Sequence, residues 1–195
     1  MYEIVRFYDA LSSLYDEIYG QEQAIKYTAL IKEVSSLLKG VVVDAGCGTL
    51  MLAEFLKLKG LTRDVTLYIG IDVSLAMLER AKTKTKRLES DSEPVEVELV
   101  RGLIERLPLR SNSANTVIAI TVLTVLHGGY RGVHEDHRAE TRAVKELLRA
   151  SKEAVIVSVL NRQESRTLIE LLTQQSKKIW HGGSDVFFLL ATKQG

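Results

Sequence analysis

Several features that direct a chain toward other classes of protein are scarce in this sequence. Its 195 residues include one cysteine, two prolines and one tryptophan. The single cysteine, Cys47, excludes an internal disulfide and a cysteine-rich metal site. No apolar run approaches the roughly 18 residues that span a bilayer, and the N-terminus lacks the basic-then-apolar layout of a signal peptide. We therefore expect a cytoplasmic protein without a membrane segment.

An excess of charge of one sign is also missing. Lysine and arginine together number 26, and aspartate and glutamate number 25, so the formal net charge is +1. No global electrostatic field therefore draws the protein to nucleic acid. The apolar fraction of 46% and the charged fraction of 26% are ordinary for a globular protein. The length suits a single domain, residues 1–195, better than two.

The stretch from Val41 to Leu50 is the most informative part of the chain. Three valines form a short apolar run, Asp44 ends it, and Gly46 and Gly48 follow in G-x-G spacing before a helical pattern. This order is typical of a buried strand, a tight turn and the start of a helix. Glycine at such a turn lets a ligand approach the backbone, because no Cβ blocks it. Taken alone, the stretch fits an ordinary strand-to-helix turn equally well.

The N-terminal part is expected to be a helical cap, residues 1–40, on a core formed by residues 41–195. We expect helix over 1–39 with a break at Gly20 and a stop at Gly40. Two Tyr-Asp pairs, at 8–9 and 15–16, lie seven residues apart and hence on one face of a helix. Packing of these tyrosines against the core is the plainer interpretation of the spacing.

From residue 41 onward, strand and helix patterns alternate, as in a parallel sheet covered on both faces. Apolar and charged residues alternate in 95–100, which indicates a strand at a sheet edge. The expected strands are 41–45, 65–72, 95–100, 116–120 continuing into 121–127, and 154–160. The expected helices are 50–59, the segment after the capping residue Ser74, 139–150 and 162–177, followed by a C-terminal hairpin.

Two acids at the ends of successive strands point to the kind of ligand. Asp72 can accept hydrogen bonds from both hydroxyls of a ribose. A dinucleotide would need a third glycine after Gly48, where the chain reads Thr-Leu-Met, and Asp44 would repel its pyrophosphate. The residues suit a nucleoside that carries a cationic, amino-bearing tail.

Three segments, 41–50, 69–78 and 102–121, resemble in order the motifs of class I S-adenosylmethionine-dependent methyltransferases, closest to the ubiquinone-biosynthesis-type (type 11) branch. The likeness covers about residues 8–160. It implies a Rossmann-like three-layer α/β sandwich with a seven-stranded, mostly parallel sheet in the order 3-2-1-4-5-7-6, the last strand antiparallel. It also implies an enzyme that uses S-adenosyl-L-methionine.

The resemblance also implies roles for individual residues. Asp44 would reach the methionine ammonium, and Asp72 would hold the ribose hydroxyls. The other matching positions are Tyr15 over the cofactor carboxylate, the turn residues Ala45, Gly46, Cys47 and Gly48, Val73 against the adenine, the backbone of Leu103 or Ile104 at the adenine amino group, and Thr121 near the sulfonium. Leu50 replaces the family's usual third glycine, and Leu103 replaces an acid that often contacts the adenine. We expect Leu50 to tighten or reshape the tail pocket and both changes to weaken cofactor binding.

The motifs leave the methyl acceptor open. His127 follows the fourth strand and is the candidate general base, which a hydroxyl or acidic carbon would require; a loop or packing role is its plainer interpretation. No metal is expected, because the cluster at 134–137 lacks a helical i, i+4 pair of ligands and cysteines.

The absence of an Asn-Pro-Pro-Tyr-like segment after strand four and of a suitable cysteine nucleophile favours a small molecule over nucleobases. Two alternatives stay open. One is an RNA or protein acceptor, with a partner subunit at the edge strand 95–100. The other is a non-catalytic adenosylmethionine-binding regulator.

Overall fold

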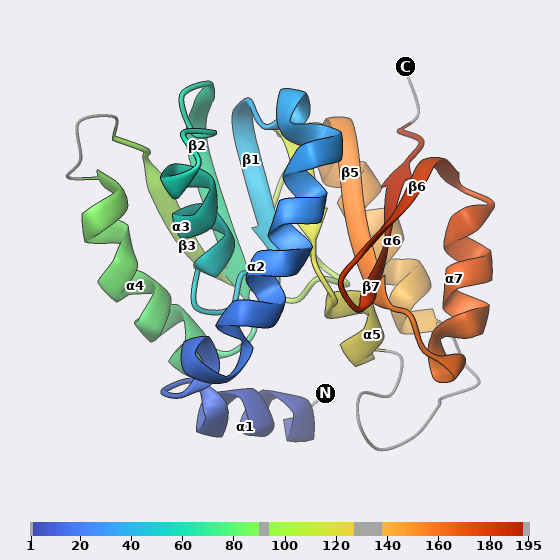
Figure 1. Ribbon diagram of the computed structural model, residues 1–195, viewed down its shortest axis with the longest axis horizontal. Coiled ribbons are helices and arrows are strands. Elements are labelled where there is room, and N and C mark those ends of the chain that lie inside the picture. The colour runs from blue at the N-terminus through green and yellow to red at the C-terminus, as the bar shows by residue number, and fades with distance from the viewer. Residues whose placement is uncertain (1, 90–93, 127–137, 193–195) are drawn as a thin grey trace.

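The computed structural model describes residues 2–89, 94–126 and 138–192, which form one seven-stranded sheet with helices on both faces (Figure 1). The strands are β1 Gly40–Ala45, β2 Val65–Asp72, β3 Val97–Arg101, β4 Ala114–Ala119, β5 Ser151–Leu160, β6 Ser176–Gly182 and β7 Asp185–Leu190. Their order is β3-β2-β1-β4-β5-β7-β6, and β7 runs antiparallel to both of its neighbours. The other pairs are parallel. The Rossmann-like fold and the edge position of the third strand are thus confirmed.

Alternation along β1 builds a core on each face of the sheet. Val42 packs on the face covered by α2, α3 and α4, whereas Val43 and Ala45 pack on the face covered by α5, α6 and α7. The helices are α1 Tyr2–Leu11, α2 Tyr15–Val34, α3 Met51–Leu58, α4 Leu75–Glu89, α5 Val122–Leu126, α6 Arg138–Ala150 and α7 Arg166–Thr173, with single 3-10 turns at Ser35–Leu37 and Gln163–Ser165. Within the described ranges, no helix is long and apolar enough to cross a bilayer.

Helix α1 lies across the carboxyl ends of the parallel strands rather than on a face of the sheet (Figure 1). Its Asp9 accepts a hydrogen bond of 2.5 Å from the hydroxyl of Ser74. That hydroxyl also accepts a bond from the backbone N–H of Met77, so Ser74 caps α4 as expected. One serine thus both begins α4 and attaches α1.

The helical cap differs from the prediction in its breakpoints. The break lies at residues 12–14, and α2 runs through Gly20, where a Cβ would meet nothing within 4 Å. Helix α2 ends at Val34, and Gly40, with φ of 60°, opens β1 instead of stopping a helix. The two Tyr-Asp pairs consequently lie on different helices.

Two segments after the core strands also differ from the prediction. The strand expected to continue into 121–127 stops at Ala119, because Thr121 adopts a left-handed φ of 64° and α5 follows at once. The helix expected over 162–177 is shorter, since α7 ends at Thr173 and β6 begins at Ser176.

Candidate functional site

A cavity of about 310 Å³ lies at the carboxyl ends of β1, β2 and β4, beneath α1 and α2. The strand order reverses between β1 and β4, and open α/β sheets bind ligands in the crevice at such a switch point. Most of the residues predicted to bind the cofactor line this cavity: Tyr15, Ala45, Gly46, Gly48, Asp72, Val73, Leu103, Ile104 and Thr121.

The turn after β1 forms a cradle that a side chain would fill. Gly46 has φ of 87°, and a Cβ there would overlap Val122. The N–H groups of Gly46 and Cys47 donate to the carbonyl of Ile71, at 2.7 and 3.0 Å, which fixes the turn to the end of β2. Gly48 leaves open backbone beside the ring of Tyr15, because nothing else comes within 4 Å of its Cβ position.

Asp72 joins the turn to the end of β2. Its Oδ2 accepts a bond of 2.9 Å from the N–H of Gly48, and its Oδ1 accepts one of 2.9 Å from the N–H of Ser74. Burial raises the pKa of Asp72, and the N–H groups of Ser74 and Gly48 oppose that rise. The carboxylate is therefore held in one orientation, while each oxygen keeps a lone pair for ligand hydroxyls.

Asp44 and Cys47 lie behind the turn and do not line the cavity. The hydroxyl of Tyr68 donates to Oδ2 of Asp44 at 2.8 Å. Burial raises the pKa of Asp44 to about 7, with Tyr68 opposing the rise and the charge of Asp72 adding to it. Burial likewise raises the pKa of the Cys47 thiol. At neutral pH Asp44 is divided between its two forms, so a nearby cation would draw it toward the carboxylate.

Leu50 does not narrow the cavity, contrary to expectation. It adopts a left-handed φ of 71°, and its side chain is fully buried in the core. Gly70 on β2 contributes to the room, because a Cβ at position 70 would lie 2.9 Å from Leu99, 3.0 Å from Cys47 and 3.2 Å from Cδ1 of Leu50. The missing third glycine therefore alters the core and leaves the cavity open.

Helix α2 presents a polar and aromatic face to the cavity. The ring of Tyr15 lies 4.9 Å from that of Tyr19 and 6.2 Å from that of Tyr8 on α1, measured between centroids. Burial raises the pKa of Tyr15, and a hydrogen bond with the side chain of Gln23 opposes this, so the phenol stays protonated. Both tyrosines of the Tyr-Asp pairs therefore reach the cavity, although they lie on different helices.

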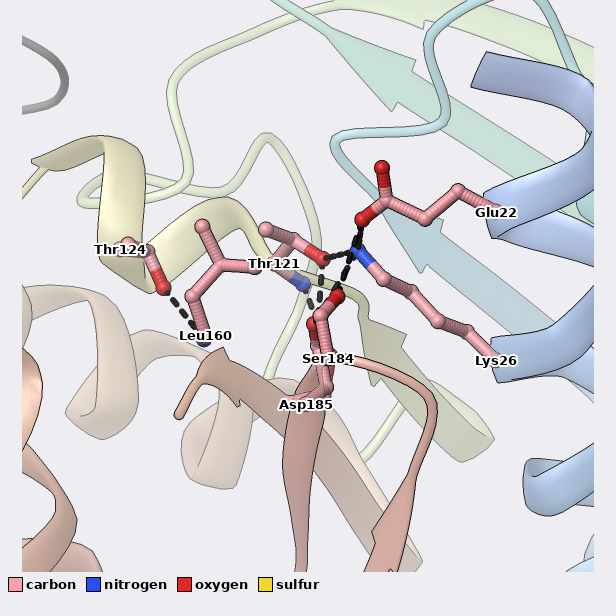
Figure 2. Close-up of polar contacts among 8 residues, drawn as sticks. Glu22, Lys26, Thr121, Thr124, Leu160, Ser184 and Asp185 are labelled. Atoms are coloured by element: carbon pink, nitrogen blue, oxygen red, sulfur yellow. Dashed lines mark hydrogen bonds and ion pairs between the residues drawn. The ribbon is translucent and has the colours of Figure 1, made fainter. Parts of the chain in front are cut away.

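Thr121 lines the cavity and belongs to a second set of polar side chains, whose contacts Figure 2 shows. Its backbone N–H donates to Oγ of Ser158 at 2.9 Å, and its hydroxyl donates to Oδ2 of Asp185 at 2.8 Å. The same hydroxyl accepts a bond of 3.1 Å from Nζ of Lys26. These bonds hold the left-handed conformation that ends β4.

Lys26 lies at the centre of these contacts and also lines the cavity. Its Nζ lies 2.8 Å from Oε1 of Glu22 and 3.1 Å from Oδ1 of Asp185. The side chains of Lys26 and Asp185 are 2% and 0% exposed, so their ion pair is buried, whereas that of Glu22 is 42% exposed. We call Glu22, Lys26, Thr121 and Asp185 the lysine cluster.

The sequence interpretation missed the lysine cluster apart from Thr121. The available signal was that Lys26 stands four residues before Leu30, on the buried face of α2. Glu105 was missed as well: it lines the cavity near Leu103, and its Oε2 is buried without a hydrogen-bond partner in the described part of the chain. His127 and the cluster at 134–137 lie outside the described residues.

Comparison with known proteins identifies the family. A family profile described as a methyltransferase domain matches residues 43–157, more than half of the chain. No curated protein matches in sequence. A structure from Methanococcus maripaludis, assigned as an S-adenosyl-L-methionine-dependent methyltransferase, is 13% identical with a TM-score of 0.69, covering 98% of this chain and 94% of that one.

Two further structures share the fold. A Thermotoga maritima S-adenosylmethionine-dependent methyltransferase, for which histamine N-methylation has been suggested, is 18% identical with a TM-score of 0.63, covering 97% of this chain and 100% of that one. A Haloferax volcanii protein assigned as a methyltransferase, in complex with the Trm112 activator, is 19% identical with a TM-score of 0.56, covering 86% and 66%. The chain therefore belongs to the methyltransferase domain family, as a class I S-adenosylmethionine-dependent enzyme of the type 11 branch.

Proposed function

We propose that this cavity binds S-adenosylmethionine and that the enzyme methylates a small-molecule acceptor. The observation that carries the proposal is the hydrogen bond between the N–H of Gly48 and the carboxylate of Asp72. It joins the glycine turn after β1 to the acid at the end of β2, so both motifs face one cavity. A nucleoside with an amino-bearing tail needs these two features side by side.

The lining residues suggest how the cofactor would be held. Asp72 would accept the ribose hydroxyls, Tyr15 would cover the methionine carboxylate, and Val73 would pack on the adenine. Glu105 would accept the adenine amino group, in place of the acid that is missing at Leu103. Its buried, unpartnered oxygen in the same wall supports this role.

Asp44 would stabilise the methionine ammonium from behind the turn. When bound, the cofactor supplies a methyl group that is already activated. The protein's own task is then to hold the acceptor in line and exclude water, and such alignment supplies roughly 7 to 11 kcal/mol.

A small acceptor is favoured because α1 and α2 cover the cavity, with Tyr8 and Tyr19 among the residues that they contribute. A second candidate is methylation of RNA or a protein side chain with the help of a partner subunit. The position of β3 at the sheet edge favours it, since a partner strand can add to such an edge. The Haloferax volcanii structure, in which a similar fold is bound to an activator, adds to that support.

Calorimetric titration with S-adenosylmethionine tests the cofactor site. We expect the parent chain to bind and Asp72→Asn to bind at least about ten-fold more weakly, since a charged hydrogen-bond acceptor is lost. Asp64→Asn is the matched control, because Asp64 is exposed and immediately precedes the opposite end of β2. No binding by the parent, or equal binding by the two variants, would contradict the proposal.

Mass spectrometry of cells with and without the protein tests the acceptor. A methylated metabolite that disappears with the protein supports the small-molecule proposal. Loss of a methylated RNA nucleoside or protein side chain instead favours the partner-assisted alternative.

A further inference from the structure

We propose that the end of the cavity at the lysine cluster binds the methyl acceptor, and that it selects an amine carried on an apolar body. The inference rests on the proposed function, which assigns the Asp72 end of the cavity to the cofactor. The two polar ends come from different elements: Asp72 ends β2, whereas Glu22 and Lys26 lie on α2 and Thr121 follows β4.

Gln23 supplies independent evidence for a ligand at this end. The residue is 7% exposed and lines the cavity next to Glu22. Its side chain hydrogen-bonds with Tyr15, and its Oε1 is buried with no hydrogen-bond partner among the residues described. Buried amide oxygens are nearly always paired. Because this oxygen can only accept, the group that completes the site must donate an N–H or O–H.

The charges of the lysine cluster favour a cation over an anion. Two carboxylates, of Glu22 and Asp185, surround one ammonium, so the cluster carries a net charge of −1. Lys26 has three protons, and they point to Glu22, Asp185 and Thr121. Lys26 is therefore occupied and has no donor left for an anionic ligand.

Glu22, Lys26 and Thr121 all line the cavity, and Glu22 is the carboxylate among them. Figure 2 shows its second carboxylate oxygen directed away from Lys26. Partial burial works against ionisation of Glu22, but the hydrogen bond from Lys26 prevails and lowers its pKa, so the side chain is a carboxylate at neutral pH. A carboxylate and an amide oxygen, both acceptors, then stand at neighbouring positions of α2.

Among the described residues, the side chains that α5 and the end of β5 add to the cavity wall are apolar. Val122, Val125 and Leu126 from α5 and Leu160 from β5 line the cavity around Thr121. An acceptor that fits both parts combines a head group that donates hydrogen bonds, preferably with a positive charge, with an apolar body. A primary or secondary amine has that head group. Its ammonium form would bind first, and transfer of one proton to the Glu22 carboxylate would leave the nitrogen lone pair that attacks the methyl group.

A matched set of three probes tests this inference by binding alone. Phenethylamine, 2-phenylethanol and 3-phenylpropionate share an aromatic body and differ in head group. Each is titrated calorimetrically into the full chain saturated with S-adenosylhomocysteine, which fills the cofactor end and carries no methyl group to transfer. We expect phenethylamine to bind at least about ten-fold more tightly than 3-phenylpropionate.

Variants on α2 locate the effect. Glu22→Gln should weaken phenethylamine about ten-fold and leave 2-phenylethanol unchanged, because only the charged contact is lost. Gln23→Met should weaken both. Glu17→Gln is the control, since it makes the same charge change on an exposed side chain of α2 away from the cavity and should alter neither. Thermal unfolding of each variant verifies that it is folded.

Three results would overturn the inference: equal affinity for the amine and the carboxylate, amine binding weaker than about 10 mM, or identical behaviour of Glu22→Gln and Glu17→Gln. Failure of S-adenosylhomocysteine to bind the parent chain is a different outcome, because it would refute the proposed function itself.

Discussion

Replacing Lys26 by methionine should destabilise the protein more than any change on the exposed face of α2. Methionine keeps the apolar stem but removes the charge, so Asp185 loses its cation while its side chain stays 0% exposed. Breaking a buried pair from one side costs about 3–5 kcal/mol. We expect the lower end, about 3 kcal/mol, for two reasons. Hydroxyls of Thr121 and Ser158 still donate to Asp185, and water can reach Glu22.

Urea unfolding at pH 7 measures this loss. With a slope of about 2 kcal/mol per molar urea, a loss of about 3 kcal/mol lowers the midpoint by roughly 1.5 M. The double variant Lys26→Met/Asp185→Asn should be more stable than the single one, because it removes both charges together. Lys32→Met, on the exposed face of α2, should change stability by less than about 0.5 kcal/mol. A loss below about 1 kcal/mol for Lys26→Met, or a double variant that loses the sum of both single losses, would refute the reasoning.

Three further changes probe the glycine turn and its surroundings. Leu50→Gly should lower the free energy of unfolding by about 2 kcal/mol, because the loss of a buried leucine side chain outweighs the relief of its left-handed φ. A variant that is more stable than the parent in urea unfolding would contradict this. Asp44 has a folded-state pKa raised from 3.8 to about 7, so its contribution to stability is present below pH 4 and lost as pH rises through 7. The parent should therefore lose about 2–3 kcal/mol of unfolding free energy relative to Asp44→Asn between pH 5 and pH 8. Urea unfolding of both proteins at the two pH values measures this change. A difference between the two proteins that stays the same at both pH values would show that the pKa of Asp44 is ordinary. Ser74→Ala should lower the free energy of unfolding by about 1 kcal/mol, because it removes the cap of α4 and the hydrogen bond to Asp9. Limited proteolysis should then cut α1 faster than in the parent. An unchanged rate would show that this hydrogen bond does not hold α1 in place.

Local patterns explain which parts of the fold could be predicted. Strands such as Val41–Val43 are continuous apolar runs, and the order of the sheet followed from the resemblance of three motifs. The prediction that the strand continues after Ala119 was wrong because Thr-Val-Leu-Thr-Val-Leu has the composition of a strand. Thr121 ends β4 through bonds with Ser158 and Asp185, 37 and 64 residues away, which no local pattern contains.

The two ends of the cavity also differ in how far local sequence patterns could predict them. The Asp72 end could be predicted because each of its parts follows directly from a strand in a short motif. The lysine cluster brings together α2, the second residue after β4 and the start of β7. Its members are therefore scattered over 164 positions of the chain, from Glu22 to Asp185. The position of Lys26 on the buried face of a helix was the one local indication of the lysine cluster.

The pairing of Leu50 with Gly70 has a consequence for how this turn is recognised. Gly70 lies on the adjacent strand, opposite Asp44 in the register of β1 and β2, and the side chain of Leu50 packs beside it. A side chain at position 70 would therefore displace Leu50, Cys47 or Leu99, so the leucine at the turn depends on the glycine on the strand. A search template that pairs a large residue at the turn with a small one on the next strand would find such proteins where a template of consecutive glycines passes over them.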